Sequence, residues 1–439
     1  MFNEEARKGG KEETMKRIFV YVPLLLMCGA LAAVVVEPLP VANGVAAAQA
    51  ELPRAAISPS IVRLEPGGQC QFSIKLKPTG PSGQSGDSAG VASWTLKGMP
   101  DGGAEFGTIT DSGLYTAPAR IPRFNEICIM ATLEGVANQY AWATVLLGSK
   151  DPEYTLVNCW GENGKGPGQF TDPHGITVGT DGNLVVTDSA GHRVYRFTRD
   201  GKFLGELIPA EGPFQGPRAA VEDASGNIYV ADGTWNRIVK FSPDGKTIAS
   251  WGKSGSGPGD LNRPHGIAIG QHGQVYVPDV DNHRIQVYDS SGKFLFQVGG
   301  TTGQGQGYSL RPHGIDSDPS GNIFFNEYNG IIHKFSADGT HLLTFTARVD
   351  IETTTCHMMA CDNNGNFYLC ARVDKGQRGL ILKYNNEGDF ITSFVAPSKP
   401  GQVFMPHHCA IDEEGRVYAT EIGRGRKCTV EVLEPGSPR

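Results

Sequence analysis

One short motif recurs at nearly constant spacing through the last two-thirds of the chain. A proline, a histidine and a glycine stand together at residues 173–175, 264–266 and 312–314, and related triplets stand at 217–219, 356–358 and 406–408. The central positions are 174, 218, 265, 313, 357 and 407, which are 44 to 50 residues apart. A fixed period in this range is typical of propellers and solenoids, in which every repeat is one supersecondary unit. The repeat therefore predicts a ring or a stack of similar units.

Each repeat contains four apolar runs separated by turns, which predicts an antiparallel sheet of four short strands. In the third repeat the predicted strands are 265–269, 274–278, 284–288 and 294–298. Asp-Gly turns at 200–201, 244–245 and 338–339 favour hairpins in three other repeats. The last repeat supplies only three strands, whereas residues 155–161 resemble the outer strand at 247–252. We therefore expect the first strand to close the ring against the last sheet, giving a six-bladed β-propeller over residues 154–435 without long exposed edges.

A second all-β domain is predicted before the propeller, over residues 52–147. Short alternating runs separated by Gly, Pro and Ser indicate strands at 70–76, 91–96 and 127–133. These strands carry Cys70, Trp94 and Cys128, and this order is the core pattern of immunoglobulin-like sandwiches. We therefore expect an N-terminal immunoglobulin-like β-sandwich with a Cys70–Cys128 disulfide, the alternative being two unpaired buried thiols. We expect this domain to act as a spacer or adhesion module.

The N-terminus has the pattern of an export signal. Lys16 and Arg17 precede the apolar run 18–36, and Ala48-Gln49-Ala50 follows it. A basic head, an apolar stretch and a small-residue site in that order are typical of a secretory signal peptide, here residues 1–50. Met15 is an alternative start. The expected location is therefore secreted, periplasmic or on the cell surface, and the alternative is an anchor formed by an uncleaved N-terminal helix.

The net charge bears on the partners of the protein, and the cysteines bear on its disulfides. The chain has 46 acidic and 39 basic residues, for a net charge of −7. Nucleic acid is bound through clustered Lys and Arg, so we expect no nucleic-acid partner, and we expect a monomer. In an exported protein some cysteines should pair. Six further cysteines have no assigned partner at this stage: Cys159, Cys356, Cys361, Cys370, Cys409 and Cys428.

The histidines gather in one position of the repeat. All eleven lie at or after residue 174, and five of them occupy the central motif position. Random placement of eleven histidines over 439 residues would put about 0.15 in those six positions, so the position selects histidine. The inner strands of a propeller line its channel, and imidazoles that converge there favour a divalent metal, with zinc as the expected ion. Calcium is kept as an alternative. The alternative is that each histidine only bonds to the backbone of the neighbouring blade.

Geometry predicts which histidines share the ion. Six positions around an axis cannot all reach one ion, but every second one can. This selects His174, His265 and His357 as ligands. The other triangle contains Arg218, His313 and His407, with Arg218 and His313 as candidates for orienting an anionic group. The acids that end the second strands, such as Asp188 and Asp279, are interpreted as structural partners of nearby arginines.

The repeats resemble a known family. Trp160-Gly161-x-x-Gly164-x-Gly166-Pro167-Gly168-Gln169-Phe170, followed by Pro173-His174-Gly175-Ile176 and Thr187-Asp188, resembles the NHL repeat. Among NHL propellers, the chain is similar to peptidyl-α-hydroxyglycine α-amidating lyases. That resemblance implies a zinc ion held by three histidines from alternate blades and cleavage of the N–C bond of a C-terminal hydroxyglycine.

The resemblance assigns two ligands and leaves the third open. Its motifs match His174 and His265. For the third ligand, counting every second repeat favours His357, whereas the family's Met-Pro-His motif favours His407. Where the family has its active-site tyrosine, this chain has Thr234 and Trp235. The family's catalytic arginine corresponds to Arg218 by position only. The lyase chemistry is therefore predicted less directly than the metal site.

Two functions follow as hypotheses. The first is an exported metalloenzyme, lyase-like or hydrolytic, with zinc at the histidines and with Arg218 or His313 orienting an anionic group of a small-molecule or peptide substrate. The second is a propeller without catalytic activity that binds a peptide, glycan or protein partner over the channel mouth. RNA binding conflicts with the export signal and with the acidic charge.

Overall fold

The computed structural model describes the chain from residue 54 to residue 436 with ten internal gaps. The described ranges are 54–77, 91–97, 106–122, 125–133, 140–148, 153–300, 311–347, 355–373, 378–394, 405–421 and 430–436. These residues form strands β1 to β35 and no α-helix, which confirms the all-β class. The signal-peptide prediction for residues 1–50, and Cys428, lie outside the described residues. Within the described ranges, no helix is long and apolar enough to span a bilayer.

Three small sheets form from the residues before 150. The first pairs β1 (Arg54–Ser58) with β4 (Ser73–Lys77). The second has the order β2 (Ile61–Leu64), β9 (Tyr140–Leu147), β8 (Glu126–Leu133) and β5 (Val91–Lys97). The third has the order β3 (Gln69–Gln71), β7 (Leu114–Thr116) and β6 (Thr108–Ile109). We call these three sheets the N-terminal sheets.

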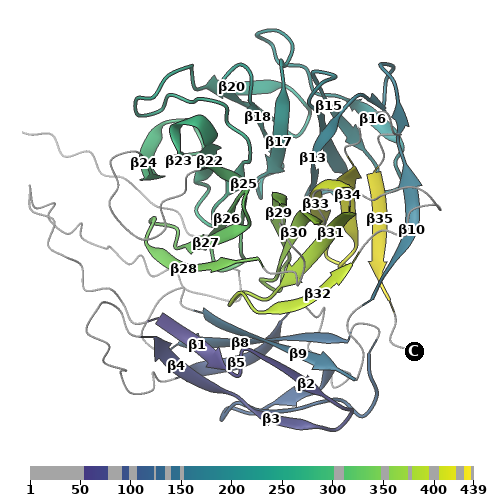
Figure 1. Ribbon diagram of the computed structural model, residues 1–439, viewed down its shortest axis with the longest axis vertical. Helices are drawn as coiled ribbons and strands as arrows, with labels where there is room; N and C mark the ends of the chain where they lie inside the picture. The colour runs from purple at the N-terminus through teal and green to yellow at the C-terminus, as the bar shows by residue number, and fades with distance from the viewer. Residues whose placement is uncertain are drawn as a thin grey trace, which may run out of the picture. The chain divides into compact units, whose positions relative to one another are not determined.

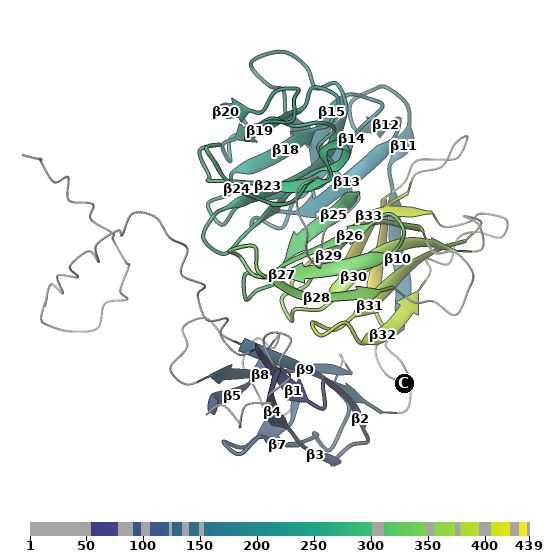
Figure 2. The ribbon, with the colours of Figure 1, turned by 60° about the vertical axis from the view of Figure 1, so that its left-hand side comes forward.

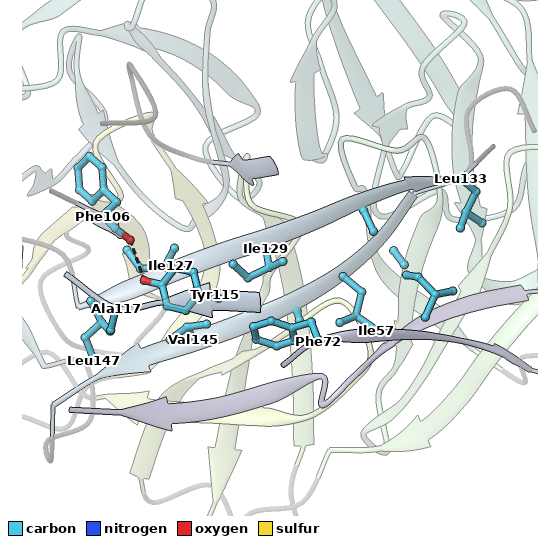
Figure 3. Close-up of a cluster of buried hydrophobic side chains, with 14 residues drawn as sticks. Ile57, Phe72, Phe106, Tyr115, Ala117, Ile127, Ile129, Leu133, Val145 and Leu147 are labelled. Atoms are coloured by element: carbon cyan, nitrogen blue, oxygen red, sulfur yellow. Dashed lines mark hydrogen bonds between the residues drawn. The ribbon is translucent and has the colours of Figure 1, made fainter. Parts of the chain in front are cut away.

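One apolar core joins the N-terminal sheets (Figure 3). Alternate residues of β8, such as Ile127 and Ile129, point into it beside Val145 of β9 and Phe72. Alternation places every second side chain of a strand on the same face, which explains why this run of β8 is apolar at odd positions. Tyr115 is fully buried, and its hydroxyl donates a hydrogen bond to the Phe106 carbonyl oxygen at 2.7 Å.

Two predictions for this region are wrong. The strand expected over 70–76 is divided at Phe72, because β3 pairs with β7 whereas β4 pairs with β1. The Cys70–Cys128 disulfide is not formed. Cys70 packs against the shared core, but Cys128 lies on the opposite face of β8 with Met130 and Trp142. Even-numbered residues of β8 face away from the core, so the two sulfur atoms cannot meet there.

Six four-stranded sheets follow, which we call the first to fifth sheets and the closing sheet. The first contains β13 (Pro173–Val178), β14 (Leu184–Asp188), β15 (Arg193–Phe197) and β16 (Phe203–Glu206). The second contains β17 (Pro217–Glu222), β18 (Ile228–Asp232), β19 (Arg237–Phe241) and β20 (Thr247–Trp251). The third contains β21 (Ala268–Ile269), β22 (Val275–Asp279), β23 (Arg284–Tyr288) and β24 (Phe294–Gly299). Each of them is an antiparallel meander.

The fourth and fifth sheets repeat this order. The fourth contains β25 (Pro312–Ser317), β26 (Ile323–Glu327), β27 (Ile331–Phe335) and β28 (His341–Thr346). The fifth contains β29 (Thr355–Cys361), β30 (Phe367–Val373), β31 (Arg378–Tyr384) and β32 (Phe390–Phe394). A short parallel pair, β11 (Glu162–Asn163) and β12 (Gln169–Phe170), precedes the first sheet.

The closing sheet takes strands from both ends of this region. β33 (Pro406–Ile411), β34 (Val417–Glu421) and β35 (Val430–Pro435) are completed by β10 (Tyr154–Trp160), which pairs antiparallel with β35. This confirms the predicted closure by the first strand. The pairing gives β35 a partner on its outer side and removes an exposed edge.

The first strands of the six sheets lie beside one another (Figures 1 and 2). Each one contacts the first strand of the next sheet, and β33 contacts β13, so the series is closed. This arrangement is that of a β-propeller, with the first strands around the axis. Residues at equivalent positions of the first strands therefore come together, whatever their separation in the sequence.

Acid–base pairs join the second and third strands of two sheets. Arg237 Nε donates to Asp232 at 3.2 Å, and Arg284 Nε donates to Asp279 at 2.8 Å, with all four side chains buried. The first sheet departs from this pattern. Arg193 donates instead to the Tyr195 hydroxyl and to a loop carbonyl, while the Asp188 carboxylate accepts backbone N–H groups of residues 171, 172 and 191. These contacts support the structural role predicted for the second and third pairs.

Candidate metal centre

A β-bulge places five of the six central motif residues. Pro173 pairs with Asp188 and Gly175 with Thr187, so His174 is the extra residue between two regular pairs. The same register shift occurs at the motif in four other first strands, around residues 218, 313, 357 and 407. Proline suits the position before the bulge because it has no N–H to pair, and a bulge redirects the side chain of the extra residue. The proline–histidine sequence thus turns the imidazole out of the sheet.

The glycine of the motif allows neighbouring first strands to approach. A Cβ atom on Gly175 would lie 2.6 Å from the Arg218 carbonyl oxygen and 2.8 Å from Thr187 Oγ1. On Gly314 it would lie 2.8 Å from the backbone of Met358 in the next sheet. Any larger residue would therefore push apart the strands that carry the histidines.

Three histidines are anchored by the backbone of a neighbouring first strand. The Nδ1 atoms of His174 and His407 lie 2.9 Å and 3.0 Å from the carbonyl oxygens of Arg218 and His174, and His313 Nδ1 lies 3.3 Å from the carbonyl oxygen of His357. A carbonyl oxygen can only accept a hydrogen bond, so Nδ1 carries the proton and Nε2 keeps its lone pair. This orientation is the one found in metal-binding histidines, whose second ring nitrogen is fixed by an outer partner.

Three of the imidazoles lie close enough to share one ion. One ring nitrogen each from His174, His265 and His407 falls within 4.8 Å of the other two. The ring centroids of His174 lie 3.9 Å from His407 and 4.8 Å from His265, and all three residues are buried. Three neutral nitrogen ligands with a remaining open position suit zinc in a catalytic site. The donor set therefore fits a divalent transition metal.

The other predicted site residues surround this trio without joining it. The structure groups His407 with His174 and His265, whereas His357 lies beside His407 with a ring separation of 4.8 Å. His313 packs against His265 with ring centroids 3.8 Å apart. The set therefore differs from the one selected by taking every second sheet, because the bond from His407 Nδ1 to the His174 carbonyl holds two neighbouring rings together.

Arg218 occupies the motif position between His174 and His265. Its Nη1 atom lies 3.2 Å from His174 Nε2 and donates to it, and its buried Nε has no hydrogen-bond partner among the described residues. Burial lowers the pKa of Arg218 from its usual value. Arg218 and a metal ion would therefore compete for the same nitrogen lone pair.

Burial controls the charge of the cluster. It lowers the pKa of His174, His265 and His407 well below the usual value, with repulsion from Arg218, His313 and His174 respectively as the next cause. Burial also lowers the pKa of His313 to about 4. The imidazoles are therefore neutral at pH 7, which is the form that binds metals.

Replacing Arg218 by methionine should raise the affinity for a divalent cation about tenfold. The change removes one hydrogen bond to His174 Nε2 and one positive charge beside the proposed ion. Competition with a chromophoric zinc chelator measures the change. Arg263→Met is the matched control, because Arg263 is paired with Asp281 at 2.7 Å and tests the loss of a nearby charge alone. An unchanged affinity in Arg218→Met would show that Arg218 does not compete.

Tyr328 is a site residue that the sequence did not reveal. Its ring lies 5.5 Å from His313 and 5.4 Å from His357, and the residue is 47% exposed. It follows Glu327, which ends β26, just as Thr234 and Trp235 follow the end of β18. The turn after the second strand of a repeat is the signal that points to it, because aromatic residues stand in that turn at Trp235 and Tyr328.

A cavity of about 240 Å³ lies among the first strands. Its lining includes Ile176, Ile269, Ile315 and Met359 from four different first strands. At its far end the Asp316 carboxylate accepts the backbone N–H of Cys361 at 2.7 Å, and burial raises the pKa of Asp316 to about 6. Apolar side chains and polar groups thus line the same cavity.

Comparison with known protein families identifies the type of repeat. The NHL repeat model matches residues 170–197 and 261–288, which include the second and third strands of the first and third sheets. This chain contains NHL repeats. Protein lin-41 of Caenorhabditis elegans is 48% identical over 48 residues, and Protein brain tumor of Drosophila melanogaster is 26% identical over 135 residues. Those segments cover 11% and 26% of this chain but only 4% and 13% of the relatives.

Solved structures with similar folds cover a large part of the chain. A protein of unknown function from Bacteroides thetaiotaomicron has a TM-score of 0.51 at 13% identity, covering 88% of this chain and 99% of that one. Virginiamycin B lyase from Staphylococcus aureus has a TM-score of 0.44 at 16% identity, covering 78% and 99%. A gluconolactonase from Xanthomonas campestris has a TM-score of 0.45 at 16% identity, covering 61% and 87%. The first of these similarities, at 13% identity, concerns the fold alone.

Proposed function

We propose that the chain is an exported metalloenzyme whose NHL repeats form one complete six-bladed propeller, preceded by an immunoglobulin-like sandwich. The observation that carries the proposal is that ring nitrogens of three buried histidines, His174, His265 and His407, lie within 4.8 Å of one another. Packing alone does not require several neutral imidazoles in one place, so the cluster favours a set of metal ligands. Zinc is the first choice of ion because imidazole nitrogens suit it, whereas calcium, the alternative kept from the sequence, takes oxygen ligands.

The proposed reaction is lyase-like or hydrolytic. An ion bound by the three histidines would act as a Lewis acid, able to polarise a substrate oxygen or to activate water. The guanidinium group of Arg218, which already reaches His174, binds an anionic group of the substrate. His313, fixed through Nδ1, accepts a hydrogen bond from the substrate at Nε2. Tyr328, next to His313, covers the site with an exposed aromatic ring.

A second candidate is a propeller that binds a peptide, glycan or protein partner without chemistry. Exposed aromatic residues near the motif favour it, since they supply contact area at little conformational cost. Tyr328 is 47% exposed and Trp235 is 46% exposed, and the Arg237 guanidinium lies 4.5 Å from the centre of the Trp235 ring. The two candidates share the channel mouth and differ in whether a metal is bound.

Elemental analysis of the purified protein tests the proposal. We expect about one zinc or other divalent metal per chain, and none in the double variant His174→Ala, His265→Ala. Near-ultraviolet circular dichroism of both proteins controls for folding. That outcome would justify screening for lyase and hydrolase activity. Absence of metal from the wild-type protein after incubation with zinc would contradict the metalloenzyme and favour the binding propeller.

A further inference from the structure

Three fully buried cysteines lie in the fifth sheet and the closing sheet. Cys356 belongs to β29, Cys370 to β30 and Cys409 to β33, and each is 0% exposed. None takes part in the proposed chemistry at the histidines. Buried cysteines act as small apolar residues unless two sulfur atoms lie close enough to react.

Strand alternation separates the three sulfur atoms into two cores. The odd-numbered residues Phe367 and Leu369 of β30 pack in one apolar cluster, which also contains Cys356. The even-numbered residues Tyr368 and Cys370 pack in another, which contains Cys409 together with Val417 and Leu433 of the closing sheet. Cys370 therefore faces Cys409 across the boundary between two sheets, whereas Cys356 lies on the other face of its own sheet.

The two facing thiols are free in the structure and pack in the same apolar cluster. A side-chain hydrogen bond with Cys409 is among the causes that raise the pKa of the Cys370 thiol. Cys409 Sγ also lies 3.8 Å from the Tyr368 carbonyl oxygen, so its sulfur is held against β30. Two thiols in this position become a cross-link by a two-electron oxidation, with loss of their two protons.

We propose that Cys370 and Cys409 form a disulfide bond that joins the fifth sheet to the closing sheet. The oxidant is a low-molecular-weight disulfide such as oxidised glutathione. One cysteine thiolate attacks it, one reagent thiol leaves, and the second cysteine displaces the other reagent thiol. One S–S bond breaks in the reagent and one forms in the protein, and the two protons leave with the two reagent thiols.

Burial determines when the bond can form. It raises the pKa of the Cys370 thiol well above its usual value, and both side chains are closed to solvent. Exchange requires an accessible thiolate, so the folded reduced protein should react slowly. The bond therefore forms during folding, and an oxidising compartment is where it would persist. The inference does not depend on the metal site.

Peptide mapping of the refolded chain tests the proposal. The full chain is reduced in urea, refolded with or without oxidised glutathione, alkylated in denaturant and digested with trypsin. Cleavage after Lys and Arg places Cys370 in the peptide 349–372 and Cys409 in the peptide 384–416. We expect these peptides to be linked in most oxidised chains, with fragmentation assigning the link to Cys370, and with Cys356 alkylated. The linked chain should unfold at a urea concentration about 1 M higher, reversed by reductant.

Two variants separate this bond from other pairings. Cys409→Ala should abolish the link and make the urea midpoint insensitive to the oxidant. Cys356→Ala removes an equally buried thiol from the opposite face and should keep both the link and the midpoint shift. Full alkylation of Cys370 and Cys409 after oxidative refolding would overturn the proposal, and so would a Cys356–Cys370 link. The unsubstituted protein decides the question alone if a variant fails to fold.

Discussion

Replacing His407 by alanine should weaken divalent-metal binding at least about 100-fold, whereas replacing His357 by alanine should change it less than about threefold. His407 contributes one of the three nitrogens that lie within 4.8 Å of one another, while His357 lies beside it and outside the set. Loss of one of three protein ligands leaves an incomplete site, and even outer partners of ligands contribute 10- to 100-fold.

Competition with a chromophoric chelator measures both affinities, and circular dichroism confirms that each variant folds. The two variants are well matched, because both histidines are buried and both occupy the central position of the motif. A large loss in His357→Ala with little loss in His407→Ala would restore the set taken from every second sheet. Equal losses would indicate that the ion lies between the two rings.

Replacing Lys383 by methionine should destabilise the protein by about 3–5 kcal/mol. Lys383 of β31 is buried, and its Nζ lies 2.5 Å from Glu126 Oε2 of β8. Asn366 Nδ2 donates to the other Glu126 oxygen at 2.7 Å. The methionine variant keeps the aliphatic volume but leaves the Glu126 carboxylate buried without a cation. Urea unfolding followed by tryptophan fluorescence measures the free energy of unfolding.

The double variant Glu126→Gln, Lys383→Met is the decisive control for that measurement. It removes both charges, and exchanging a complete buried ion pair for neutral groups is often close to neutral. We therefore expect it to recover most of the stability that Lys383→Met loses. The prediction would be contradicted if the free energy of unfolding of Lys383→Met differed from that of the wild type by less than about 1 kcal/mol. It would also be contradicted if the double variant were as unstable as the single variant.

The sheets were predictable because their determinants are local. The Asp-Gly turns, the proline before four of the five motif histidines and the alternating apolar runs are each set within about ten residues. The closing strand was also predictable, because residues 155–161 resemble other outer strands and the last repeat lacks one. Repetition made each weak local pattern stronger by showing it several times.

Features that depend on which sheets meet were less predictable. The run 70–76 has one continuous pattern, yet its halves pair with different strands, β7 and β1. Cys128 has the expected order relative to Trp94, but its even position on β8 turns it away from the core that Cys70 contacts. The grouping of His407 with His174 depends on a hydrogen bond between neighbouring strands, which residue spacing cannot reveal.

The bond from His407 to the backbone of His174 links residues 233 positions apart, and it connects the closing sheet to the first sheet. β33 belongs to a four-stranded sheet that is complete only with β34, β35 and β10, which pairs with β35. A nascent chain that ends before residue 430 therefore carries all five motif histidines without the geometry that unites them. Metal loading would then report that synthesis and ring closure are finished, and a truncated product would be distinguishable by its failure to retain the ion.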